Sequence, residues 1–135
     1  MQLRRLAPAF AHHDVTWVTV RPEYRHDLDP AERLLVVPDA TRWNRLRLVR
    51  LAVRMVWIVV RTRPHVVIST GAAPGYLAIR LGRLLGARTV WVDSIANCEQ
   101  LSLSGQRVGG HVDLWLTQWP HLARPDGPRY EGAVL

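Results

Sequence analysis

The sequence contains no lysine, so its 18 strongly basic side chains are all arginines, set against 11 acidic residues in 135. A single cysteine, Cys98, excludes an internal disulfide and fits a reducing compartment, and no cysteines and histidines have the spacing of a zinc site. The longest apolar run in the basic part of the chain covers residues 55–60, far short of the roughly 20 residues that span a bilayer. No secretory signal is recognisable at the N-terminus. We therefore expect no metal or other cofactor, and membrane contact only at a surface.

Acidic residues are absent between Asp39 and Asp93, and ten of the 18 arginines fall in that interval. The rest of the chain holds eight arginines and 11 acidic residues, a net charge of −3. A basic block inside such a chain indicates contact with an anionic surface or ligand. Apolar residues make up 48% of the sequence and charged residues 21%, which is typical of a folded domain rather than of a disordered segment.

Two hydrophobic periodicities alternate along the chain and predict alternating strands and helices. We expect strands over residues 14–20, 34–37, 65–68, 89–92 and 113–117, and helices over residues 2–12, 42–61 and 74–85. Residues 21–32 and 94–110 are polar and are expected to be connections. This order predicts one α/β domain over residues 1–135, with a mostly parallel sheet and helices on both faces. The length allows one lobe of that kind.

Small residues follow the strand expected at 65–68 and lead into the next helix. In parallel sheets a ligand crevice lies at the carboxyl ends of the strands, and a helix start offers free N–H groups. A tight turn without a ligand is the equal alternative, and the Lys-Ser/Thr pair of a phosphate-binding Walker loop is missing. We expect Gly71→Val to block a ligand without unfolding the domain. The candidate ligand-binding residues here are Ser69, Thr70, Gly71 and Gly75.

A second polar cluster follows the strand expected at 89–92 and should project from the same edge. Its hydroxyls, amide and carboxylate suit a hydroxyl-rich sugar, although a polar loop with local caps is the simpler alternative. Trp119, after the last expected strand, either stacks on a sugar or covers the core. The candidate residues of this edge are Asp93, Ser94, Asn97, Ser102, Ser104, Gly105 and Gln118.

Four stretches of the sequence, residues 66–75, 91–105, 113–120 and 127–132, together resemble one family. The runs Leu-Ser-Leu-Ser-Gly and Asp-Leu-Trp-Leu-Thr-Gln-Trp-Pro are distinctive for it. The family is that of the membrane-anchoring subunit of the UDP-N-acetylglucosamine transferase that adds the second sugar to dolichol-linked oligosaccharide. Its bacterial relatives are acceptor-side subunits of exopolysaccharide glucuronosyltransferases. More distantly, the chain is similar to the N-terminal lobe of the lipid-linked N-acetylglucosaminyltransferase of peptidoglycan synthesis.

The resemblance implies a Rossmann-like lobe of the GT-B type and a glycosyltransferase subunit that is inactive without its partner. It implies that the chain recruits a donor-binding subunit to the cytoplasmic face of the membrane, as a peripheral protein. The chain would help to bind a polyprenyl-diphosphate-linked glycan, while the partner holds most of the UDP-sugar. Transfer with inversion would then take place in the cleft between the two subunits. The sequence assigns no donor sugar, acceptor glycan or general base.

One departure from the family concerns the start of the chain. Family members begin with a strand and a Gly-Gly-His loop that leads into a helix like the one expected from Gln2. This sequence begins inside that region, without the loop, the strand or the membrane helix that some members carry. We therefore expect that the true start lies upstream of Met1, that a central strand of the sheet is missing, and that restoring it improves solubility and activity.

The helix expected over residues 42–61 carries six of the ten arginines of the basic block. At about 100° per residue, four of its arginines fall in one narrow arc with Trp43. The opposite half is expected to pack on the sheet through Leu48, Val49, Leu51, Ala52, Met55, Val56 and Val59. Near anionic lipid each arginine adds about 1 kcal/mol, and a merely solvated face is the alternative. The residues of this expected membrane surface are Arg47, Arg50, Arg54, Trp57 and Arg61.

Two other functions compete with the glycosyltransferase subunit. One is a stand-alone regulatory domain that binds a nucleotide or phosphate through residues 71–75. The other is a nucleic-acid binder, suggested by the arginines. Because the arginines alternate with a broad apolar face and no nucleic-acid motif is recognisable, we expect no nucleic-acid partner.

Overall fold

Strands and helices alternate along the chain in a computed structural model that describes residues 2–40 and 43–133. The strands are β1 (Thr16–Thr19), β2 (Arg33–Val36), β3 (Val66–Ser69), β4 (Arg88–Val92), β5 (Leu114–Thr117) and β6 (Arg129–Tyr130). The helices are α1 (Arg45–Thr62), α2 (Ala72–Leu84) and α3 (Leu103–Val108), with the 3₁₀ helices η1 (Gln2–Phe10), η2 (Pro22–Asp27), η3 (Gly109–His111) and η4 (Pro120–Leu122). The predicted α/β class is confirmed.

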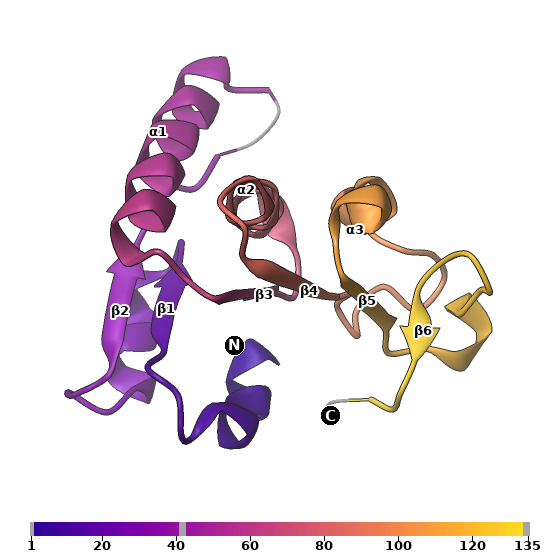
Figure 1. Ribbon diagram of the computed structural model, residues 1–135. Coiled ribbons are helices and arrows are strands. Elements are labelled where there is room, and N and C mark those ends of the chain that lie inside the picture. Colours follow the sequence, from indigo (N-terminus) through magenta and orange to yellow (C-terminus); the bar gives the residue numbers. More distant parts are fainter. Residues whose placement is uncertain (1, 41–42, 134–135) are drawn as a thin grey trace.

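All strand pairs among the described residues are parallel, but they form two sheets instead of the single sheet expected. β1 pairs with β2, and β3, β4, β5 and β6 follow one another in a four-stranded sheet. Figure 1 shows α2 and α3 on one side of the four-stranded sheet, α1 beyond the end of β1 and β2, and η1 on the side of the molecule opposite the α-helices. Because helices connect the successive strands β3, β4 and β5, their carboxyl ends all lie at one edge.

The polar connections contain helices that composition alone did not predict. Residues 21–32 hold η2, and residues 94–110 hold α3 and η3. The α3 helix forms because the Ser102 hydroxyl accepts a hydrogen bond from the backbone N–H of Gly105 at 2.9 Å, as an N-cap serine does. Turn-forming residues can therefore build a short helix where no apolar periodicity marks one.

The α1 helix begins and ends at residues with clear local causes. The Asn44 side chain accepts a hydrogen bond from the backbone N–H of Arg47 at 3.1 Å and caps the first turn. At the other end Arg63 adopts a left-handed φ of 44°, and Pro64 prevents the helix from continuing. The expected start at Arg42 lies outside the described residues.

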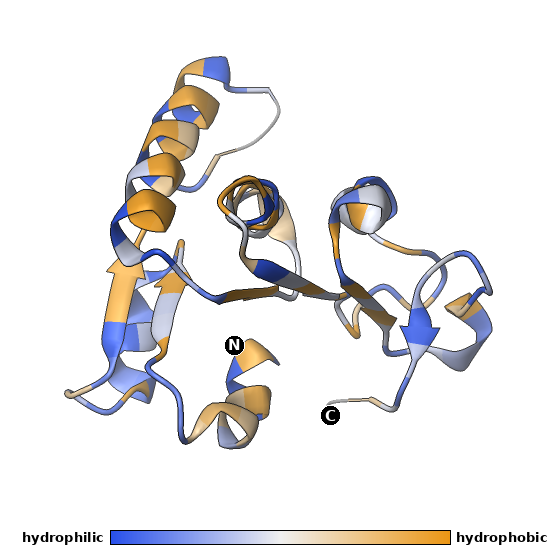
Figure 2. Cartoon of the chain, viewed as in Figure 1, coloured by the Kyte–Doolittle hydropathy of each residue, from blue (hydrophilic) through white to orange (hydrophobic). Residues whose placement is uncertain are grey.

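A hydrophobic cluster between α1, β2 and α2 forms the larger part of the core. Leu51, Met55, Ile58 and Val59 of α1 are buried there with Val37. Val49 and Val56, which were predicted to pack on the sheet, are instead exposed by 59% and 43%. The prediction was wrong at these two positions because the buried face of α1 is centred between Leu51 and Met55, and Val49 and Val56 lie about 140° and 120° around the helix from that centre. Figure 2 shows the apolar segments that run along α1 and β2.

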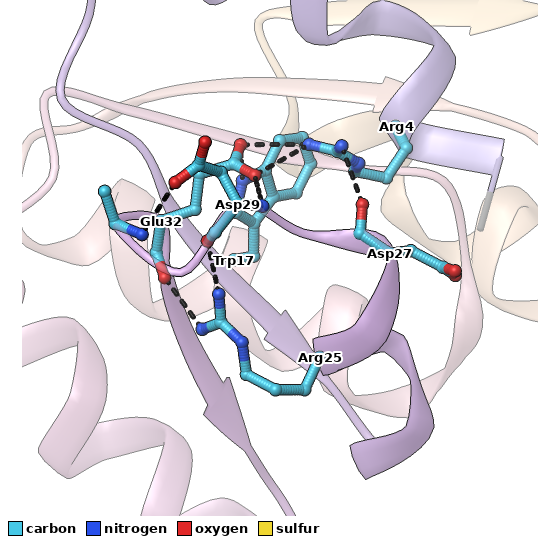
Figure 3. Close-up of polar contacts among 7 residues, drawn as sticks. Arg4, Trp17, Arg25, Asp27, Asp29 and Glu32 are labelled. Carbon is cyan, nitrogen blue, oxygen red and sulfur yellow. Dashed lines mark hydrogen bonds and ion pairs between the residues drawn. The ribbon is translucent and has the colours of Figure 1, made fainter.

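A polar network joins η1, β1 and the segment before β2 (Figure 3). The Glu32 carboxylate accepts hydrogen bonds from the Arg4 guanidinium at 2.9 Å, from the Trp17 indole N–H at 3.2 Å and from the Asp29 backbone N–H at 2.9 Å. Arg25 donates to the backbone oxygens of Glu32 and Asp29. These bonds fix a stretch that the sequence marked only as a polar loop.

Candidate functional site

Two loops meet at the carboxyl ends of β3 and β4. The strand register pairs Ser69 of β3 with Trp91 of β4, and Val92 of β4 with Leu116 of β5. The turn after β3, the loop after β4 and the segment after β5 therefore start at neighbouring points of the same edge. This edge holds all eleven residues that the sequence singled out for ligand binding.

The turn between β3 and α2 is built around Gly71. Its φ of +140° and ψ of −170° belong to a backbone region that is open essentially to glycine alone. Gly71 is also the N-cap of α2, where no side chain caps the helix among the described residues. The first amides of α2 are thus left for water or a ligand. A Cβ added at Gly71 would meet no protein atom within 4 Å.

The geometry at Gly71 corrects one expectation. Any other residue at Gly71 would be strained by the backbone angle. Gly71→Val would therefore lower the stability of the domain as well as block a ligand. The other glycine of the turn, Gly75, has a different role. Its Cβ would lie 1.9 Å from the Ser69 hydroxyl, so a hydrogen at this position lets α2 pack closely on β3. Ser69 is buried, and its hydroxyl accepts a hydrogen bond from the Gly71 N–H at 3.2 Å.

Asp93 is the centre of the loop after β4, and it is only 1% exposed. One carboxylate oxygen accepts from the Trp91 indole N–H at 3.1 Å and from the Ser102 hydroxyl at 2.7 Å. The other accepts from the Ser102 backbone N–H at 3.0 Å and the Asn97 amide at 3.3 Å. A Cβ at Gly105 would lie 2.6 Å from this carboxylate. Asp93 therefore ties together both ends of residues 93–105.

Gln118 and Ser94 attach this loop to two other parts of the molecule. The buried Gln118 amide donates to the Asp93 backbone oxygen at 2.9 Å and so links the ends of β4 and β5. The Ser94 hydroxyl donates to the Gln2 side-chain oxygen at 3.2 Å, which links the loop to η1. Gln2 itself has a buried side-chain nitrogen without a partner in the described structure.

The candidate residues divide into a buried set and a partly exposed set. Ser69, Asp93, Gly105 and Gln118 are buried and support the edge from below. Those that are partly exposed, and so open to a ligand, are Thr70, Gly71, Gly75, Ser94, Asn97, Ser102 and Ser104.

Three residues that contact this loop were missed or left undecided by the sequence. Gln2 contacts Ser94 and the Ile95 backbone, although 92 positions separate Gln2 from Ser94. The Trp119 indole donates to the Ile95 backbone oxygen at 2.8 Å, which places it as a loop support. The His121 ring contacts the Cys98 backbone oxygen. The sequence had marked Trp119 as a residue that stacks on a sugar or covers the core, and His121 stands two positions after it.

The carboxylates with shifted pKa values lie away from this edge. Asp113 stands before β5, and its pKa is lowered first by the backbone N–H of Thr89, which donates at 2.8 Å, and then by the Thr89 hydroxyl and Arg83. The pKa of Glu32 is lowered mainly by the backbone N–H of Asp29. Within residues 2–40 and 43–133, no group of three or more potential ligands could hold a metal ion.

The expected membrane-surface residues lie on α1. Arg47, Arg50, Trp57 and Arg61 are exposed, and Arg54 is partly covered. The Arg54 guanidinium lies over the Trp57 ring, 4.7 Å from its centre, and that of Arg61 lies 6.0 Å from it. In the part of the chain that the structure describes, no helix is long and apolar enough to cross a membrane.

A structural comparison shows the fold. MurG from Acinetobacter baumannii superposes with a TM-score of 0.76 over 96% of this chain and 41% of its own, at 10% sequence identity. This likeness confirms the predicted Rossmann-like lobe of the GT-B type.

Sequence comparisons identify relatives. A UDP-N-acetylglucosamine transferase subunit, ALG14, of Eremothecium gossypii is 35% identical over 91 residues, which are 62% of this chain and 41% of the relative. The namesake of Schizosaccharomyces pombe is 47% identical over 49 residues, 36% of this chain and 22% of the relative. The chain thus spans less than half the length of these relatives.

Residues 38–134 match the family model described as "Oligosaccharide biosynthesis protein Alg14 like". The match covers well over half of the chain and includes every candidate residue of the carboxyl edge. The resemblance seen in the sequence is confirmed, and this chain belongs to the Alg14-like family of oligosaccharide biosynthesis proteins.

Proposed function

We propose that this chain is one subunit of a glycosyltransferase that moves a sugar from a UDP-sugar to a polyprenyl-diphosphate-linked acceptor. The observation that carries the proposal is the family match over residues 38–134, which contains the whole carboxyl edge. The relatives of Eremothecium gossypii and Schizosaccharomyces pombe are named as subunits of a UDP-N-acetylglucosamine transferase, which makes UDP-N-acetylglucosamine the first donor to test.

The division of labour is inferred from the fold and from the names of the relatives, which are called transferase subunits. One Rossmann-like lobe would supply one wall of a GT-B cleft, and a donor-binding partner would supply the other. On this lobe the acceptor would lie against the exposed part of the carboxyl edge, near Thr70, Gly71 and Asn97. In the transfer, an acceptor hydroxyl bonds to the anomeric carbon while the bond from that carbon to the UDP oxygen breaks. The buried Asp93 holds the loop that faces the acceptor.

The proposal includes a place at the membrane. Arg47, Arg50, Arg54 and Arg61 would contact anionic headgroups together with Trp57, because α1 carries no acidic residue to oppose them. This contact would hold the cleft near a lipid-linked diphosphate and would bring the donor-binding partner with it. The membrane would be the cytoplasmic leaflet, where anionic lipids and nucleotide sugars meet.

A reconstitution tests the proposal. The chain is expressed alone and together with a small donor-binding Rossmann subunit encoded beside it, and each preparation is assayed with a panel of UDP-sugars and a polyprenyl-diphosphate-linked acceptor in detergent. We expect transfer only when both subunits are present. Transfer by the single chain contradicts the two-subunit proposal. Tight UDP binding by the single chain, with no transfer in the pair, favours the stand-alone nucleotide-binding domain instead.

A further inference from the structure

The outermost ridge of α1 is apolar, and this is not what the arginine arc predicted. Six large apolar side chains follow one another along the side opposite the buried face, with exposures between 43% and 76%. At about 100° per residue, all six fall within an arc of about 100° on the helix. The ridge consists of Leu46, Val49, Val53, Val56, Trp57 and Val60.

The ridge continues onto the edge of the neighbouring sheet. An open groove of about 740 Å³ runs between α1 and the end of β2. Its apolar wall includes Val36 and Pro38 from the β2 side and Val49, Val53 and Trp57 from the helix. Val36 is itself 41% exposed. Exposed apolar side chains so concentrated in one region mark a surface that is covered in the functional state.

The arginines around the ridge indicate what kind of partner covers it. Arg50 and Arg54 line the groove, and Arg47 and Arg61 continue the same flank, while Arg45 stands on the other side of the ridge. No acidic residue occurs between Asp39 and Asp93. An apolar face bordered by arginines, with tryptophan at the border, has the composition of helices that lie in the plane of a membrane interface. A helical protein partner would need an acidic border around its own apolar face, and this chain, whose acidic residues are dispersed, offers none for self-association.

We propose that α1 inserts its apolar ridge below the headgroups of an anionic phospholipid bilayer, with the flanking arginines at phosphate depth. This goes beyond electrostatic contact through the arginines and rests on the membrane placement in the proposed function. Insertion buries apolar side chains as well as pairing charges, so part of the binding survives in high salt, where arginine contacts alone are screened.

Vesicle binding with a matched control tests the ridge. The full chain is sedimented with vesicles of phosphatidylcholine, with and without an equal amount of phosphatidylglycerol, at low and high salt. Val53→Asp places a charge on the ridge and should weaken binding at least about tenfold. Leu84→Asp changes a side chain that is 79% exposed at the end of α2 and should bind like the wild type. Circular dichroism checks that both variants fold, and Val53→Ser gives a milder change at the same position.

Lipids brominated on their acyl chains show how deeply the tryptophan side chains enter the bilayer. Tryptophan fluorescence should be quenched when the wild type binds them, and Trp57→Phe should lose most of this quenching. Insertion is overturned if the wild type binds without quenching, or if Val53→Asp binds as tightly as the wild type. If the variant with Arg47, Arg50 and Arg54 all changed to Gln then loses binding, the electrostatic contact alone is supported. A wild-type dimer that Val53→Asp converts to a monomer also overturns it, because a second copy then covers the ridge. Sugar transfer in detergent, measured separately, reports on the proposed function alone.

Discussion

Gly71 combines a backbone conformation that favours glycine with a place in the candidate ligand site. Its φ of +140° makes any side chain costly, and yet a Cβ would point into open space. We expect Gly71→Ala to lower the free energy of unfolding by about 1–3 kcal/mol through strain. We also expect it to reduce sugar transfer more strongly than this loss of stability explains, because the methyl group would occupy the space next to the free amides of α2.

Gly86 provides the control for Gly71. It also has a positive φ, of 85°, and an added Cβ meets nothing within 4 Å, but it stands at the opposite end of α2. Gly86→Ala should cost about 1–2 kcal/mol and leave transfer by the folded protein unchanged. Urea unfolding and the transfer assay with the partner subunit compare the two variants. Equal transfer in both would mean that the turn at Gly71 is only structural.

Asp93 tests whether the loop of residues 93–105 serves the acceptor. In Asp93→Asn one oxygen becomes an NH₂ group that faces the N–H or O–H donors now paired with the carboxylate. We expect a loss of about 1–3 kcal/mol in unfolding free energy and a rise in KM for the acceptor, with little change in partner affinity. Asn97→Ala removes only the 3.3 Å bond and should have a smaller effect of the same kind. If KM for the acceptor stays at the wild-type value in both variants, the acceptor binds elsewhere.

At the scale of elements, Glu32 links η1, β1 and the segment before β2 through its hydrogen bonds. The free energy of unfolding should therefore depend on pH through this carboxylate. The pKa of Glu32 is below its ordinary value of 4.5 in the folded chain, so the folded state binds its proton less tightly than the unfolded state does. The contribution is therefore fully present above about pH 4.5 and is lost as the pH falls through the folded pKa. Glu32→Gln should be less stable at neutral pH and should lose less stability on acidification than the wild type.

Urea unfolding at a series of acidic pH values measures this profile. Part of the acid sensitivity should remain in Glu32→Gln, because the lowered pKa of Asp113 acts in the same direction. Replacement of the exposed Glu99 by Gln serves as the control and should follow the wild type. A Glu32→Gln profile parallel to the wild type would show that the network does not contribute to folding.

At the scale of the whole molecule, the apolar ridge of α1 and the edge that holds the candidate ligand residues belong to different parts of the fold. The ridge and groove lie on α1 and β2, whereas the candidate ligand residues follow β3, β4 and β5. Figure 1 shows α1 and β2 at one end of the molecule and β5 toward the other. A vesicle and a partner subunit should therefore bind at the same time.

Co-sedimentation checks simultaneous binding. The donor-binding subunit should stay in the supernatant with anionic vesicles alone and should sediment when this chain is added. Val53→Asp should prevent this without weakening the complex in solution. Competition between vesicle and partner would place the partner on α1 and contradict the arrangement.

The order of strands and helices was predictable because it depends on local patterns. β-branched runs and the apolar period of helices located β1 to β5, α1 and α2, and Pro64 and Gly86 marked helix ends as expected. The edge of the candidate site was predictable for the same reason, since parallel strands joined by helices bring their carboxyl ends together. The short helices η2 and α3 were missed because they depend on single capping and turn hydrogen bonds.

The sequence by itself determined the α/β class, the family, the basic block and the edge where the candidate ligand-binding residues gather, because each depends on residue type and spacing. Only the tertiary structure decided which face of α1 is buried. That face packs against Val37 and the helix α2, and the periodicity of α1 itself does not show where these partners lie. It likewise decided that Asp93 supports the loop from inside and that Gln2 reaches Ser94. Contacts between residues far apart in the chain follow from the packing of whole elements, and no local pattern encodes them.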